Sequence, residues 1–144
     1  MNIDLRLEEI DDSLYRVAVR ALIVSDNKLL AVKEIDGGGW WAIPGGGVDY
    51  GESLKECFLR EINEEIGVIS SSVSSDFQIV HYNIGKVVNG IPRMNVFFKA
   101  TVPVGEIVKT NHVEKWGWFT LDEFMGLEMN PSYDKAELAE VTFA

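Results

Sequence analysis

Residues 46–68 read GGVDYGESLKECFLREINEEIGV, and here the chain changes from short apolar runs to a helical repeat. Apolar side chains recur every four residues, at Leu54, Phe58, Ile62 and Ile66. This period predicts a helix over 52–66 with one buried stripe. Gly67 follows directly, at the place where a left-handed residue commonly ends a helix. The stretch therefore predicts a helix that packs one face on the rest of the domain.

Short runs of apolar and β-branched residues on both sides of this helix predict strands. These runs cover 15–24, 29–32, 40–43, 77–84, 94–101 and 115–119. The segment Pro44-Gly45-Gly46-Gly47 is expected to end the strand over 40–43, because proline and glycine are strong breakers of regular structure. The strand runs therefore flank the helix on both sides.

Two further helices are expected near the end of the chain. Thr120 and Glu123 have the spacing of a capping box, which predicts a short helix there. Pro131 suits the first position of a last helix that continues over 132–140. The order of elements predicts an α/β (α+β) fold, a sandwich around a mixed sheet, in a single domain over 1–144.

The charge balance narrows the range of partners. The chain has 144 residues, 13 Lys+Arg and 23 Asp+Glu, for a formal net charge of −10. No positive field attracts polyanions, which disfavours long nucleic acids and anionic membranes, so a phosphate ligand needs a bound cation. Small molecules are the expected partners.

Cysteine content and hydropathy indicate a cytoplasmic protein. Cys57 is the only cysteine, so no internal disulfide forms, and it lies among apolar helix positions as a small core residue. The first residues lack the apolar core of a secretory signal, and no apolar run reaches the ~20 residues that span a bilayer. We expect a monomer or a homodimer, in which residues 1–14 extend a sheet across the dimer.

Three carboxylates of the predicted helix lie within reach of one another. Glu61, Glu64 and Glu65 share a face, because residues three and four apart are neighbours on a helix. Arg60 stands four residues from both Glu56 and Glu64, so we expect it to fix one carboxylate and leave Glu61 and Glu65 facing outward. Clustered carboxylate oxygens are ligands that Mg²⁺ or Mn²⁺ takes, usually together with waters and substrate phosphates.

A solvated acidic face is the alternative interpretation of these carboxylates. The glycines at 45–47 favour a metal site, because glycine lets a backbone carbonyl turn toward a cation and lets a phosphate chain approach closely. Loop and helix together predict one site.

Nine positions of this region match a known pattern: Gly, five residues, Glu, seven residues, then Arg-Glu-apolar-x-Glu-Glu-x-Gly-apolar. They are Gly46, Glu52, Arg60, Glu61, Ile62, Glu64, Glu65, Gly67 and Val68. This is the box of the Nudix hydrolases, and the chain resembles that family, which includes MutT-like proteins. Both spacers have the family length, and residues 41–46 are also similar to the family's approach to the box.

The resemblance implies an α/β/α sandwich that hydrolyses a pyrophosphate bond with a divalent cation, Mg²⁺ or Mn²⁺. The implied substrates are nucleoside di- and triphosphates, nucleotide sugars, ADP-ribose and dinucleoside polyphosphates. It implies that Glu61, Glu64, Glu65 and the carbonyl of Gly46 bind the cation. A nucleotide-sensing module of the same fold, without catalysis, is the alternative function.

The remaining roles follow from the resemblance and from the chemistry. Glu52 and Arg60 are implied to support the box through ion pairing. A carboxylate must accept the proton of the attacking water, and Glu61 is the first candidate, followed by Glu65. Some members use an acidic residue from a later loop, for which Glu106 and Glu114 are the candidates.

Several further residues are candidates for substrate contacts. Lys33 and Arg20, near the ends of the first two strands, are candidates for phosphate binding. Gly45 and Gly46 allow close approach of the phosphate chain. Trp40 and Trp41 face opposite sides of their strand, so one packs in the core and the other, for which we take Trp40, stacks on a base.

Overall fold

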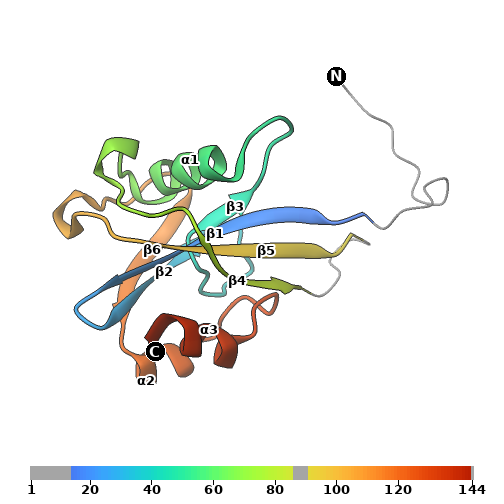
Figure 1. The fold of residues 1–144 in the computed structure, drawn as a ribbon. Coiled ribbons are helices and arrows are strands. Elements are labelled where there is room, and N and C mark those ends of the chain that lie inside the picture. Colours follow the sequence, from blue (N-terminus) through green and yellow to red (C-terminus); the bar gives the residue numbers. More distant parts are fainter. Residues whose placement is uncertain (1–13, 86–90, 144) are drawn as a thin grey trace.

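The computed structural model describes residues 14–85 and 91–143, and its centre is a mixed β-sheet (Figure 1). The strands are β1 (Arg16–Ser25), β2 (Lys28–Glu34), β3 (Gly45–Gly47), β4 (Ile79–Ile84), β5 (Arg93–Ala100) and β6 (Val113–Phe119). The helices are α1 (Leu54–Ile66), α2 (Leu121–Met125) and α3 (Lys135–Phe143), with single 3₁₀ turns at Ser70–Ser72 and Val104–Glu106. The predicted dimer segment at 1–14 lies almost wholly outside the described residues.

The sheet has the order β4-β5-β1-β2-β6, and β3 pairs with β1 beside this path. β1 runs parallel to β5 and antiparallel to β2 and β3, so the sheet is mixed. α1 covers one face, and α2 and α3 lie on the other (Figure 1). This arrangement confirms the predicted sandwich around a mixed sheet.

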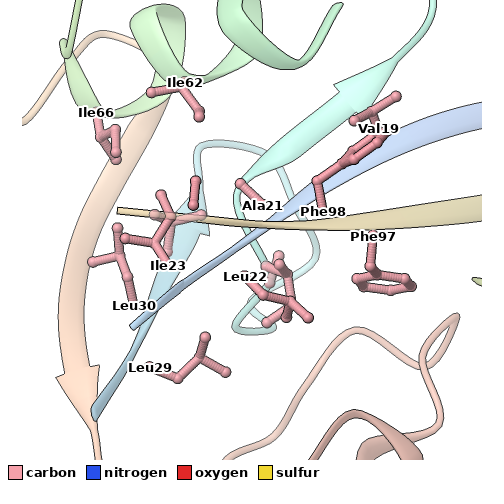
Figure 2. Close-up of a cluster of buried hydrophobic side chains, with 14 of the residues drawn as sticks. Val19, Ala21, Leu22, Ile23, Leu29, Leu30, Ile62, Ile66, Phe97 and Phe98 are labelled. Atoms are coloured by element: carbon pink, nitrogen blue, oxygen red, sulfur yellow. The ribbon is translucent and has the colours of Figure 1, made fainter. Parts of the chain in front are cut away.

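Alternating side chains of the central strands build a core on each side of the sheet (Figure 2). Phe98 of β5 points toward α1, where its ring meets Phe58 edge-on at 5.4 Å. Phe97 points to the opposite face and meets Tyr133 at 5.9 Å. Ile62 of α1 points into the layer between α1 and the sheet, which also contains Phe98. The apolar stripe predicted from the sequence is therefore the face that α1 buries.

The ends of α1 follow local capping signals. Ser53 is the N-cap, and it exchanges two hydrogen bonds with Glu56. Gly67 ends the helix in the left-handed conformation at φ 73°, and its N–H donates to the carbonyl of Asn63. The predicted terminus is confirmed, and the helix begins at Leu54, two residues later than predicted, because Ser53 is the N-cap.

The strand predicted over 40–43 is wrong, and the glycine run predicted to end it is itself the strand β3. Trp41 and Ala42 form only isolated bridges. In β3, Gly46 pairs with Val19 of β1. Gly45 has φ 146°, and a Cβ there would collide with the Val19 carbonyl oxygen. Glycine thus allows this backbone to approach β1 more closely than a side chain would permit.

The last helix begins later than Pro131 predicts. Pro131 lies in a turn in which Asn130 accepts hydrogen bonds from the N–H groups of Ser132 and Tyr133. Asp134 then accepts the N–H of Glu137 through its side chain, so it caps α3. By contrast, the capping box predicted at Thr120 is confirmed at the start of α2. None of the described helices is long and apolar enough to cross a membrane.

Candidate active site

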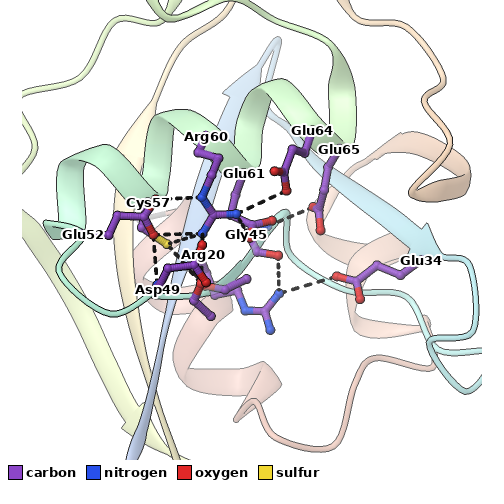
Figure 3. Close-up of polar contacts among 12 residues, drawn as sticks. Arg20, Glu34, Gly45, Asp49, Glu52, Cys57, Arg60, Glu61, Glu64 and Glu65 are labelled. Atoms are coloured by element: carbon purple, nitrogen blue, oxygen red, sulfur yellow. Dashed lines mark hydrogen bonds and ion pairs between the residues drawn. The ribbon is translucent and has the colours of Figure 1, made fainter. Parts of the chain in front are cut away.

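Arg60 of α1 is the centre of the polar contacts at this site (Figure 3). Its Nε and Nη2 donate to the two oxygens of Glu52, at 2.7 and 2.9 Å. Its Nη1 donates to Glu61 at 2.8 Å and to Glu64 at 3.2 Å, and Nη2 also donates to the Gly47 carbonyl at 3.1 Å. One guanidinium therefore joins the helix to the loop that precedes it.

The carboxylates of Glu61 and Glu64 lie side by side, because both contact the same nitrogen of Arg60. The side chain of Glu61 is only 13% exposed, and Glu64 is 39% exposed. Glu61 therefore does not face outward as predicted. The expected pairing of Arg60 with Glu56 is also wrong, since Glu56 is used in the capping box at the start of α1.

Glu65 points into the protein, which corrects the expectation that it faces outward. The residue is 4% exposed, and its carboxylate accepts the N–H of Gly45 at 2.9 Å. On the other side of this loop, Nη1 of Arg20 donates to the carbonyls of Ile43 at 3.2 Å and Gly45 at 3.1 Å. Gly45 is thus held at both its N–H and its C=O, which fixes the approach to Gly46.

Arg20 differs from its predicted role. It lies in the interior of β1, is 3% exposed, and directs its guanidinium to backbone carbonyls. The guanidinium also lies over the aromatic ring of Tyr133, with 5.6 Å between the guanidinium carbon and the ring centroid. Arg20 is therefore not at a strand end, where a phosphate contact was predicted. Its hydrogen bonds instead support the loop that contains Ile43 and Gly45.

Glu34, at the end of β2, lies near the site although no sequence pattern points to it. Its carboxylate lies 3.7 Å from Nη1 of Arg20. Burial raises the pKa of Glu65 well above its usual range, and the neighbouring charge of Glu34 raises it further. The predicted strand ends before this residue, and its position near Arg20 depends on how β2 lies relative to β1, which the local sequence does not reveal.

Burial and ion pairing act in opposite directions on the other carboxyls. The hydrogen bonds from Arg60 lower the pKa of Glu52 to about 2, with help from the Asp49 N–H. Burial raises the pKa of Glu61, although Arg60 opposes this shift. Burial also raises the pKa of the Cys57 thiol to about 12, consistent with the predicted small core residue.

The donor set has the chemistry that a hard divalent cation requires. Gly46 packs so tightly on the Glu61 carboxylate that an added Cβ would overlap it, so the loop backbone and the helix carboxylates share one small space. Carbonyl and carboxylate oxygens suit Mg²⁺ or Mn²⁺. Among residues 14–85 and 91–143, no group of three His, Cys, Asp or Glu side chains is close enough together to hold a metal ion. In this structure the guanidinium of Arg60 supplies the positive charge beside Glu61 and Glu64.

Comparison with known proteins agrees with this geometry. The model of the NUDIX domain family matches residues 14–140. The chain belongs to the Nudix family. The match includes the loop at β3, the whole of α1 and all nine box positions quoted from the sequence.

Relatives of this Nudix chain act on several kinds of pyrophosphate. The ADP-ribose pyrophosphatase of Methanocaldococcus jannaschii is 46% identical over 55 residues, which cover 37% of this chain and 32% of that protein. The RNA pyrophosphohydrolase of Nitratiruptor sp. is 36% identical over 78 residues, half of each protein. A solved UDP-X diphosphatase is similar in fold, with a TM-score of 0.75 and 22% identity over 97% of this chain and 70% of that one.

The other predicted residues of the Nudix chain lie in different surroundings. Glu106 and Glu114 are exposed, on the 3₁₀ turn at Val104–Glu106 and on β6, and neither makes a described ion pair with the box. Trp40 is 40% exposed, whereas Trp41 is half-buried against Phe119, so the expectation that one of the pair is packed is confirmed.

Proposed function

We propose that this chain is a divalent-cation-dependent pyrophosphohydrolase. Its substrate would be a nucleoside di- or triphosphate, or a nucleoside diphosphate linked to another group. The observation that carries the proposal is the arrangement of Glu61 and Glu64 on one nitrogen of Arg60, directly beside the Gly45–Gly47 loop. The names of two relatives, an ADP-ribose pyrophosphatase and an RNA pyrophosphohydrolase, support the same reaction class.

Glu61, Glu64, Glu65 and the carbonyl of Gly46 are the proposed ligands of Mg²⁺ or Mn²⁺. Such a cation, when bound, neutralises substrate phosphates and lowers the pKa of a water molecule. The chain itself holds the ligands in place: Arg60 keeps two carboxylates together, and Gly45 is fixed between Glu65 and Arg20. This preorganisation reduces the cost of gathering like charges.

Glu61 is the proposed general base. Its carboxylate lies directly against Gly46, another proposed cation ligand, so it is placed to accept a proton from a water bound to the cation. Glu65 remains the second candidate, but it is more deeply buried and one of its oxygens already accepts the Gly45 N–H. Glu106 and Glu114 remain the candidates from later segments; both are exposed, and neither makes a described ion pair with Arg60.

A substrate panel tests the proposal. Purified protein is incubated with nucleoside triphosphates, ADP-ribose, nucleotide sugars and dinucleoside polyphosphates, with Mg²⁺, with Mn²⁺ and with EDTA, and the products are separated. We expect cleavage of a pyrophosphate bond in at least one class, abolished by EDTA and restored by added cation. Binding of a nucleotide without product in any class would instead identify a nucleotide-sensing module.

A further inference from the structure

We propose that Lys33, Lys115 and Trp41 form an anion subsite that binds a phosphate group of the substrate beyond the scissile pyrophosphate. This inference rests on the proposed function and names its substrate class, a nucleoside polyphosphate. The two lysines are directly opposite each other in the pairing of β2 with β6. Each Nζ lies 5.4 Å from the centroid of the same Trp41 ring. Two positive charges therefore share one aromatic platform.

Within residues 14–85 and 91–143, no carboxylate forms an ion pair with either lysine. Like charges placed directly opposite in a sheet destabilise it, and the cation–π contacts offset only part of that cost. The chain carries an excess of acidic residues, yet in the described part neither lysine has a carboxylate oxygen within 4.0 Å. Glu34, the sequence neighbour of Lys33, directs its carboxylate to Arg20 instead. An anionic ligand would supply the missing counter-charge.

The indole of Trp41 is held firmly enough to act as a platform. Phe119 meets it edge-on, with centroids 4.9 Å apart and ring planes at 74°. The backbone of Trp41 donates to the carbonyl of Glu128 and accepts from the N–H of Asn130, both at 2.8 Å. Phe119 therefore supports the ring and residues 128 and 130 hold the backbone of Trp41, so the ammonium groups contact a surface that is already in place before binding.

Chain connectivity links the subsite to the candidate active site through the end of β2. Lys33 precedes Glu34, and Glu34 lies within 3.7 Å of Arg20, which in turn holds the carbonyl of Gly45 (Figure 3). A phosphate chain with its scissile bond at the box would thus have a cationic region beside it. A neutral sugar in the same place would gain nothing from the lysines, so the subsite favours substrates with additional phosphates.

Binding of inorganic tripolyphosphate in EDTA, measured by isothermal titration calorimetry at low salt, tests the subsite without any reaction. We expect Lys33→Gln and Lys115→Gln each to weaken binding about tenfold, the effect of losing one charged hydrogen bond, and the double variant to abolish it. The control is the double variant Lys28→Gln and Lys109→Gln, which lowers the net charge equally at two positions away from Trp41 and should bind like the wild type.

The variant Glu64→Gln separates this inference from the proposed function, since it should still bind tripolyphosphate in EDTA even though it lacks a proposed metal ligand. Equal binding by the two double variants would overturn the subsite and leave the lysines with a structural role only. With an active protein, KM for a nucleoside triphosphate should rise in the Lys33 and Lys115 variants, while KM for a nucleotide sugar should not; a parallel rise for both would also overturn it.

Discussion

Replacing Arg20 by Met should destabilise the protein strongly, because it removes the group that supports the glycine loop. The side chain is 3% exposed and donates to the carbonyls of Ile43 and Gly45, both of which are buried. Each carbonyl left without a partner costs about 1–3 kcal/mol. Glu34 also loses its counter-charge, so we expect a total loss of about 3–5 kcal/mol in the free energy of unfolding.

Urea unfolding at pH 7 in EDTA, followed by tryptophan fluorescence, measures this loss. The matched control is Arg16→Met, which removes an exposed arginine from the same strand and should change the free energy by less than about 0.5 kcal/mol. Adding Glu34→Gln to Arg20→Met should recover about 1 kcal/mol, because once Arg20 is absent the Glu34 carboxylate repels that of Glu65. If Arg20→Met costs no more than the control, the support assigned to Arg20 is wrong.

Three further changes test the surroundings of the loop and helix. Gly45→Ala should cost more than about 3 kcal/mol or prevent folding, because the new Cβ would overlap the Val19 carbonyl oxygen; urea unfolding that matches the wild type would contradict this. Arg60 lowers the pKa of Glu52, so its stabilisation is complete above the ordinary carboxyl pKa and is lost as pH falls toward about 2. Glu52→Gln should therefore flatten the loss of stability between pH 5 and pH 2, and parallel curves for variant and wild type would exclude this contribution. Cys57, whose pKa burial raises to about 12, should resist thiol reagents at pH 8 in the native protein and react in urea, whereas rapid native labelling would refute its burial.

The parts of the fold that the sequence predicts well are those set by neighbouring residues. The four-residue apolar period and Gly67 define α1, and Thr120 with Glu123 defines the start of α2, because each signal lies within one or two turns. The glycine strand β3 has no such signal. It exists because its backbone fits against β1, and that contact joins residues more than twenty positions apart.

The candidate site shows the same division. The helical spacing correctly brings Glu61 and Glu64 to one side, and the box pattern brings Glu52 to Arg60. Spacing alone does not show that Glu65 points inward or that Arg20 is buried. Both depend on the loop at Gly45, to which both side chains are hydrogen-bonded. The sequence does not distinguish a surface carboxylate from a buried one, because burial is decided by how the chain packs.

The most direct test of the central claim compares turnover by Glu64→Gln and Glu56→Gln on the substrate that the wild type cleaves fastest with Mg²⁺. Both changes remove one charge from α1, but Glu64 lies on Arg60 beside the glycine loop, whereas Glu56 only caps the helix. We predict that Glu64→Gln lowers kcat by at least about a hundredfold, the loss of roughly 3 kcal/mol of transition-state stabilisation, while it stays folded. Glu56→Gln should retain kcat within a few-fold. Equal turnover by the two variants would contradict the assignment of the box as the catalytic site.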